Sequence, residues 1–119
     1  VLALLDARMD EVYSAAFDWN GQHWTPRMPL QVGPPQQLVL PEAPRVLMAG
    51  NAGPAYADRL PCAEHLQALP TAAALLRLAP LLWADGHAVP ADQAMPLYIR
   101  DKVAQTTAER LAAKMAGPA

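Results

Sequence analysis

Three acidic residues near the start of the chain, Asp6, Asp10 and Glu11, are close enough in sequence to do chemistry together. Paired carboxylates can hold a metal ion or act as general acid and base. The alternative is an ordinary turn, because Asp favours turns and Arg8 lies among the acids as a counter-charge. We favour the turn, so these positions predict no metal site and no catalytic residue.

Cys62 and His65 have the only spacing typical of a metal-binding pair. A zinc site needs three or four ligands, and no further ligand has a matching position. A nucleophilic Cys62 would need a neighbouring base, which His65 could provide. The chain has no G-x-S-x-G, Walker or G-x-G-x-x-G motif. Structural roles for both residues are therefore favoured, and no residue is predicted to be catalytic.

The acidic residues lie between two predicted strands, 1–6 and 11–17, which predicts a hairpin with its turn at 7–10. Asn20-Gly21 is a strong turn signal, and 23–30 can return as a third strand. Pro26 and Pro29 would confine that strand to the edge of the sheet. We expect an antiparallel meander, followed by a proline-rich loop over 32–44.

The second part of the chain predicts a strand, a glycine turn and helices. Arg45–Gly50 is a short apolar run, Gly50–Gly53 is a turn, and a helix follows over 54–60. A second helix is predicted over 71–85, which Pro80 should kink or divide in two. The pattern further predicts an extended piece over 96–100 and a helix from a capping box at Thr106–Glu109 to about 115.

Composition limits the classes of protein that fit. The chain has 119 residues and one cysteine, which predicts a single domain over 1–119 with no internal disulfide. The predicted strands and helices make that domain α/β. Its net charge is −2. The charge gives no reason to expect direct nucleic-acid binding, and the lone cysteine fits a reducing, cytoplasmic compartment. No apolar run approaches the ~18 residues of a membrane span. Because the chain opens within an apolar run and without Met, we expect the C-terminal half of a longer protein.

Two stretches of the sequence are similar to the TsaB (YeaZ) family of bacterial tRNA threonylcarbamoyladenosine biosynthesis proteins. Val1-Leu-Ala-Leu-Leu-Asp-Ala-Arg-Met-Asp-Glu-Val-Tyr13 resembles the opening of the family's C-terminal half. Met95-Pro-Leu-Tyr-Ile-Arg-Asp-Lys-Val-Ala-Gln-Thr106 resembles its C-terminal signature. The strand 45–50 and the helix around Leu78–Gly86 also match elements of the family.

The resemblance implies a fold and a role. The fold is a ribonuclease H-like lobe of the actin/Hsp70/sugar-kinase (actin-like ATPase) superfamily, the second of two lobes. The role is that of a non-catalytic partner of a TsaD-like paralogue, the transferase, and a TsaE-like ATPase in tRNA threonylcarbamoyladenosine modification. ATP and Mg would be needed only in the full complex, and tRNA would be contacted only indirectly. The resemblance also allows a homodimer and implies no membrane contact.

The resemblance also implies how active members of that superfamily bind nucleotide. In those proteins, the first hairpin of this lobe holds a phosphate through the backbone N–H groups of glycines. Here the hairpin has no glycine, and its acids would repel phosphate with only Arg8 to offset them. Gly50-Asn-Ala-Gly53 resembles the superfamily's adenosine loop. The predicted site is therefore a degenerate nucleotide cleft, formed by Asp6, Arg8, Glu11, Gly50, Asn51 and Gly53.

Two alternatives stay open at the level of sequence. One is a homo-oligomeric interaction module without a tRNA role, with Tyr56, Leu60 and Trp83 at the interface. The other is an enzyme, in which Asp6 and Glu11 do metal-assisted chemistry or the domain is a glycoprotease-like peptidase homologue. The chain has no histidine pair typical of a zinc protease.

Overall fold

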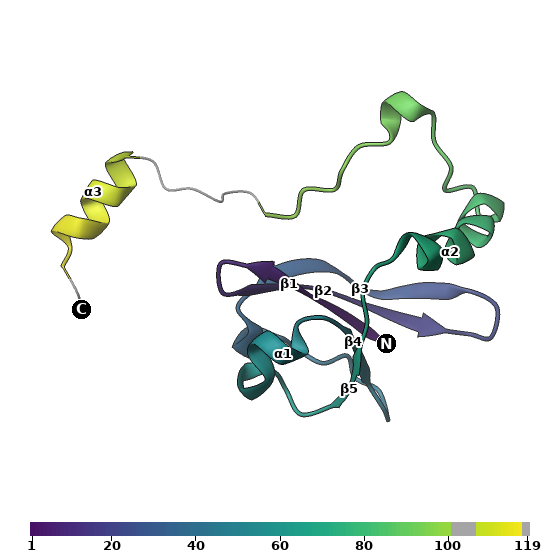
Figure 1. Ribbon diagram of the computed structural model, residues 1–119, viewed down its shortest axis with the longest axis horizontal. Coiled ribbons are helices and arrows are strands. Elements are labelled where there is room, and N and C mark those ends of the chain that lie inside the picture. The colour runs from purple at the N-terminus through teal and green to yellow at the C-terminus, as the bar shows by residue number, and fades with distance from the viewer. Residues whose placement is uncertain (101–106, 118–119) are drawn as a thin grey trace.

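A five-stranded mixed sheet organises the chain, in the order β3-β2-β1-β4-β5. The computed structural model describes residues 1–100 and 107–117 (Figure 1). The strands are β1 (Leu2–Arg8), β2 (Glu11–Trp19), β3 (Trp24–Gly33), β4 (Leu47–Gly50) and β5 (Glu64–Gln67). The helices are α1 (Gly53–Tyr56), α2 (Ala72–Ala84) and α3 (Thr107–Met115), and short 3-10 turns lie at Pro35–Gln37, Ala57–Arg59 and Ala91–Gln93.

The predicted meander is confirmed. β1 pairs antiparallel with β2, and β2 pairs antiparallel with β3, with Pro26 on the outer strand as expected. β4 then returns on the other side of β1 as a parallel strand, and β5 adds parallel to β4. Three antiparallel strands followed by two parallel ones give the strand order of a ribonuclease H-like sheet, with β1 at its centre.

The core lies where the central strands meet α1. Alternate residues of β1 and β2 point to one face of the sheet, which buries Leu2, Leu4 and Val12 almost completely. The remaining members of this core cluster are Ala16, Met48, Ala52 and Tyr56. Since Ala52 and Tyr56 enter the core from the segment after β4, the sheet fixes that segment beside the β1–β2 hairpin.

Several predicted boundaries differ from the structure. β3 continues to Gly33, into the stretch predicted as loop, because Tyr13 and Val12 provide partners for Val32 and Gly33. β5 has no counterpart among the predicted elements. The helix predicted over 54–60 is a single turn of α-helix, α1, followed by a 3-10 turn.

Helix α2 begins as the sequence predicts but does not divide. Thr71 caps its first turn, with its Oγ1 accepting a hydrogen bond from the Ala74 N–H at 3.1 Å. Pro80 lies inside one continuous helix, so the expected second helix does not form. Gly86 follows the helix with a φ of 78°, the left-handed conformation that ends many helices. Residues 96–100 form no regular element, and the predicted cap at Thr106 lies outside the described residues.

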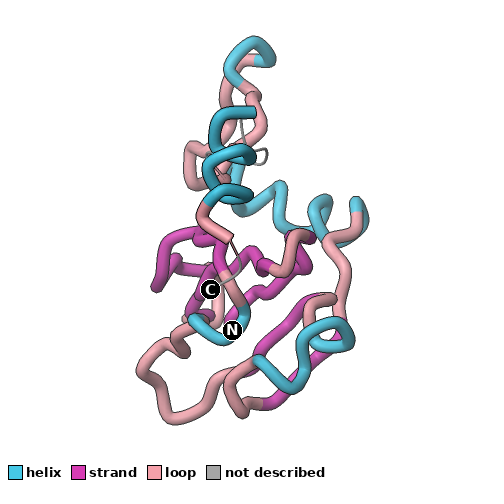
Figure 2. Tube along the Cα trace, turned by 90° about the vertical axis from the view of Figure 1, so that its left-hand side faces the viewer, coloured by secondary structure: helices cyan, strands magenta, loops and turns pink. Residues whose placement is uncertain are grey.

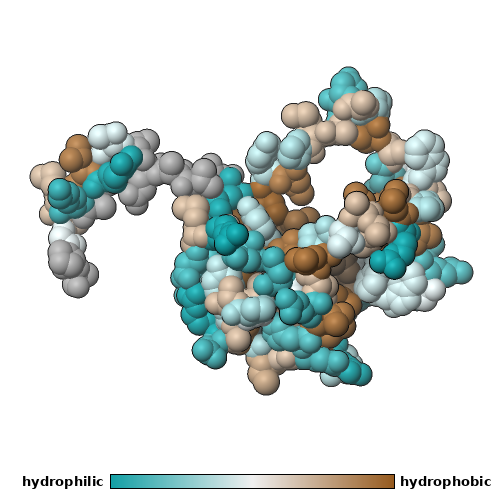
Figure 3. All heavy atoms as spheres, viewed as in Figure 1, coloured by the Kyte–Doolittle hydropathy of each residue, from teal (hydrophilic) through white to brown (hydrophobic). Residues whose placement is uncertain are grey.

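Apolar side chains of α2 face solvent. The helix has no buried residue, and Leu75, Leu76 and Trp83 are each more than 60% exposed. Figure 3 shows apolar surface on the α2 side of the molecule, and in Figure 2 helical segments stand above the strands. The interface predicted from Tyr56, Leu60 and Trp83 is wrong for Tyr56, because that side chain is buried in the core. None of the helices within residues 1–100 and 107–117 has the length and hydrophobicity of a bilayer-spanning segment.

Candidate functional site

The turn between β1 and β2 has an unusual backbone. Arg8, Met9 and Asp10 have φ angles of 61°, 54° and 64°, in the left-handed region that glycine adopts most readily. Each such residue costs about 1–2 kcal/mol when it carries a Cβ. The turn therefore has the backbone conformation of a glycine turn without any glycine. Contacts from the rest of the chain must stabilise this conformation, since strained backbone persists only where its surroundings enforce it.

Asp6 is the centre of the first set of contacts. Its Oδ1 accepts hydrogen bonds from the Arg8 N–H at 2.8 Å and from the Tyr56 hydroxyl at 2.9 Å. Its own N–H donates to Asn51 Oδ1 at 2.8 Å. The Arg8 and Tyr56 donors lower the pKa of the Asp6 carboxyl, and the same carboxylate raises the pKa of Tyr56. Asp6 therefore stays ionised and joins the hairpin to the segment after β4.

Asp10 is held by Arg59 from the 3-10 turn after α1. Arg59 donates from its two terminal nitrogens to the two carboxylate oxygens, at 2.7 and 2.6 Å. This forked geometry is the strongest arrangement available to an arginine and a carboxylate. The pairing lowers the pKa of Asp10 and raises that of Arg59, whose guanidinium also lies 5.1 Å from the centre of the Tyr56 ring.

Glu11 is held by Arg100, which lies 89 positions further along the chain. Arg100 Nη2 donates to Glu11 Oε2 and to the carbonyl oxygen of Ala7, at 2.5 and 3.1 Å. Its guanidinium lies 5.8 Å from the centre of the Tyr13 ring, on β2. The second and third acids of the hairpin are thus each matched by an arginine from a distant segment.

Arg8 offsets the acids only in part, as predicted. Its side chain is 87% exposed, and its Nη1 lies 3.8 Å from Asp6 Oδ2. Arg59 and Arg100 supply the remaining positive charge, so the hairpin is close to neutral. Repulsion of phosphate by the acids is therefore a weak argument against nucleotide binding. The stronger argument is that the N–H groups of Asp6 and Arg8 already donate hydrogen bonds within the chain.

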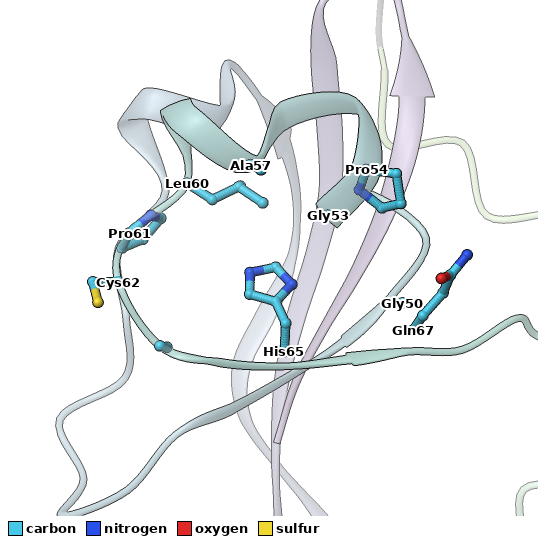
Figure 4. A pocket seen from close by; sticks show the side chains of 10 residues that line it. Gly50, Gly53, Pro54, Ala57, Leu60, Pro61, Cys62, His65 and Gln67 are labelled. Carbon is cyan, nitrogen blue, oxygen red and sulfur yellow. The ribbon is translucent and has the colours of Figure 1, made fainter.

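The glycine loop, Gly50-Asn-Ala-Gly53, lines a separate cavity of about 640 Å³ with its two glycines, together with residues of β5 (Figure 4). Position 50 requires glycine for packing, because a Cβ there would lie 1.8 Å from the Leu4 carbonyl oxygen. A Cβ on Gly53 would lie 3.0 Å from His65 Nδ1, a side chain that can move. His65 points from β5 toward α1, and Cys62 lines the same cavity from the loop before β5.

The predicted site residues thus fall into two groups. Asp6, Arg8 and Asn51 meet at the hairpin, where Glu11 also lies, whereas Gly50 and Gly53 line the cavity. Reasoning from sequence missed Tyr56, Arg59 and Arg100, which provide the partners of the three acids. One feature of the sequence could have indicated these partners. The hairpin has three acidic residues and only one basic residue, so cations from elsewhere in the chain are needed to balance its charge. Within residues 1–100 and 107–117, no three Cys, His, Asp or Glu side chains form a group able to hold a metal.

Two solved structures from Pseudomonas aeruginosa share this fold. An uncharacterized protein with similarity to peptidase YeaZ matches at 35% identity with a TM-score of 0.74, over 83% of this chain and 48% of that one. YeaZ itself matches at 34% identity with a TM-score of 0.71, over 82% of this chain and 48% of that one. In fold and in sequence, the chain is YeaZ-like. It spans about half the length of these relatives, and the predicted ribonuclease H-like, actin-like ATPase fold is confirmed. No protein-family model and no curated protein sequence matches the chain.

Proposed function

We propose that this YeaZ-like chain is a non-catalytic scaffold lobe in tRNA N6-threonylcarbamoyladenosine modification. It would act with a TsaD-like paralogue that performs the transfer and a TsaE-like ATPase. The likeness to YeaZ in sequence and fold supports the family. The argument for a scaffold rather than a catalyst comes from the β1–β2 hairpin.

The observation that carries the proposal is that two backbone N–H groups of the hairpin already donate hydrogen bonds within the chain. A triphosphate is held by free backbone N–H groups that converge on it. Here the N–H of Asp6 donates to Asn51 Oδ1, and the N–H of Arg8 donates to Asp6 Oδ1. A phosphate would have to displace both side-chain oxygens, and one of them belongs to the Asp6 carboxylate, whose charge the Arg8 N–H stabilises.

The arginines near the hairpin also have partners within the chain. Arg59 is bound to Asp10 by both terminal nitrogens, and Arg100 is bound to Glu11 and to Ala7. A ligand phosphate would have to compete with Asp10 for Arg59 and with Glu11 for Arg100. ATP and Mg are therefore proposed to act elsewhere in the full complex, and tRNA to be bound through the partners. The net charge of −2 agrees with indirect contact.

Calorimetry of the chain with Mg-ATP tests the absence of a triphosphate site. We expect no binding tighter than about 1 mM, equivalent to about −4 kcal/mol. Micromolar binding would contradict the proposal.

A reconstituted transfer reaction tests the role. The chain, joined to the first lobe that the proposal expects, is combined with the paralogue, the ATPase and tRNA, with and without Met9→Gly in the turn. We expect the substitution to leave the transfer rate within about twofold, because the turn does not touch the reacting groups. A loss of more than tenfold at unchanged affinity for the paralogue would show a catalytic hairpin and contradict the proposal.

A peptidase function is the second candidate, because Cys62 and His65 line one cavity and one relative is described as similar to a peptidase. It predicts that Cys62→Ser abolishes cleavage of an unstructured peptide by the chain. Under the scaffold proposal, the wild-type chain shows no such cleavage above background.

A further inference from the structure

The segment before residue 100 is attached to the sheet in an unusual way. Met95, Leu97 and Tyr98 are 74–82% exposed, and residues 94–100 form no regular element. Arg100 differs sharply, because its side chain is only 13% exposed. A large charged side chain is rarely buried to this degree unless it is paired. Arg100 therefore has a specific partner surface on the sheet.

That surface is the β1–β2 hairpin, which contacts Arg100 with four different groups. Glu11 provides a carboxylate oxygen, Ala7 a carbonyl oxygen at 3.1 Å, and Met9 its sulfur at 3.6 Å. The Tyr13 ring lies at 5.8 Å. A carboxylate, a carbonyl and an aromatic face together suit a guanidinium better than an ammonium, because the planar group can donate at its edge and stack on its face.

One feature makes this contact weaker than a permanent one. Arg100 Nε is buried and has no hydrogen-bond partner within the described residues. A buried donor without an acceptor costs free energy that the same donor would recover in water. The hydrogen bonds of Arg100 Nη2 thus stabilise the docked arrangement, whereas the unpaired Nε–H destabilises it. This balance favours a reversible attachment.

We propose that the β1–β2 hairpin is a docking site for the chain's own segment 96–100, with Arg100 as its anchor. When docked, the segment acts as a strap. It neutralises Glu11 and holds the carbonyl of Ala7, next to the three residues with left-handed backbone. When released, it frees Glu11 and removes one of the contacts that stabilise the turn. This inference does not depend on the proposed role in tRNA modification.

Trypsin provides a direct test, because it must take the arginine side chain into its own pocket before it cleaves after Arg100. Cleavage after Arg100 therefore reports the released state, and its rate follows the released population when docking is fast. The variant Glu11→Gln removes the charge with little change of shape. Glu42→Gln is the matched control, since Glu42 is exposed and its carbonyl, not its carboxylate, contacts Arg27.

We expect Glu11→Gln to increase the rate of cleavage after Arg100 by about tenfold and Glu42→Gln to leave it unchanged, because a hydrogen bond to a charged group contributes on the scale of a tenfold equilibrium change. The far-UV circular dichroism spectrum checks that both variants are folded. Equal cleavage rates in wild type, Glu11→Gln and Glu42→Gln would overturn the proposal.

Hydrogen exchange gives a second readout that does not depend on altering the hairpin. Arg100→Gln should increase amide exchange in a peptide that covers residues 7–11, whereas Arg77→Gln on the exposed surface of α2 should not. Unchanged exchange of residues 7–11 in Arg100→Gln would also overturn the proposal.

Discussion

Gly50 offers the sharpest test of how the glycine loop is built. A Cβ at this position would lie 1.8 Å from the carbonyl oxygen of Leu4 and 2.6 Å from its carbonyl carbon. Both atoms belong to the backbone of β1, so no side-chain rotation relieves the clash. We therefore predict that Gly50→Ala forces β4 away from β1.

The size of the effect follows from that distance. Ordinary van der Waals contact begins at 3.4 Å, so the two strands must separate by about 1.6 Å at this point. Hydrogen bonds of about 2.9 Å do not survive such a shift. The parallel pairing of Leu4 with Gly50 would be lost, and the bond from the Ala68 N–H to the Gly50 carbonyl would be strained. We expect a loss of roughly 3–5 kcal/mol, a large share of the stability of a small domain.

Urea unfolding followed by tryptophan fluorescence measures this loss against two matched glycines. Gly33→Ala meets no atom within 4 Å and should change the free energy of unfolding by less than about 0.5 kcal/mol. Gly53→Ala meets only the movable His65 side chain at 3.0 Å and should cost about 1 kcal/mol or less. If Gly50→Ala were as stable as Gly33→Ala, the close approach of β4 to β1 would be refuted.

Two further predictions concern the hairpin. Tyr56→Phe removes the hydroxyl bound to Asp6, so the melting temperature should fall most between about pH 5 and pH 9. The lowered pKa of Asp6 stabilises the fold above its ordinary value of 3.8, and the raised pKa of Tyr56 does so below 10.0, so the difference from wild type should shrink outside these limits. A difference that is constant from pH 2 to pH 11 would argue against the bond. Met9→Gly should leave the chain as stable as wild type or up to about 1 kcal/mol more stable, because glycine adopts the left-handed φ of 54° without strain. Thr25→Gly on β3 should instead cost about 0.5–1 kcal/mol in chemical unfolding, and the opposite order would contradict the strained turn.

The local part of the fold was predictable from sequence. Apolar residues in β1 and β2 separated by a short polar turn predict a hairpin, and Thr71 and Gly86 mark the ends of α2 through their capping chemistry. β5 was not predictable, because its sequence, Glu-His-Leu-Gln, has little strand propensity and all four residues are exposed. It forms because β4 provides a free parallel edge, which no local pattern reveals.

The candidate site divides in the same way. Asp6 and Glu11 could be selected from their position at the hairpin, and Asn51 from the glycine turn. Arg59 and Arg100 could not, because their partners lie 49 and 89 positions away. Only the sheet order, which places β4 beside β1, brings the segment after β4 to the hairpin.

A titration with Mg-ATP, followed residue by residue through the backbone amides in nuclear magnetic resonance spectra, tests the central claim most directly. The N–H groups of Asp6 and Arg8 are already bound within the chain, so their signals should not move at millimolar nucleotide. Saturating shifts at these two amides, with a dissociation constant in the micromolar range, would show that the hairpin binds triphosphate and would contradict the account.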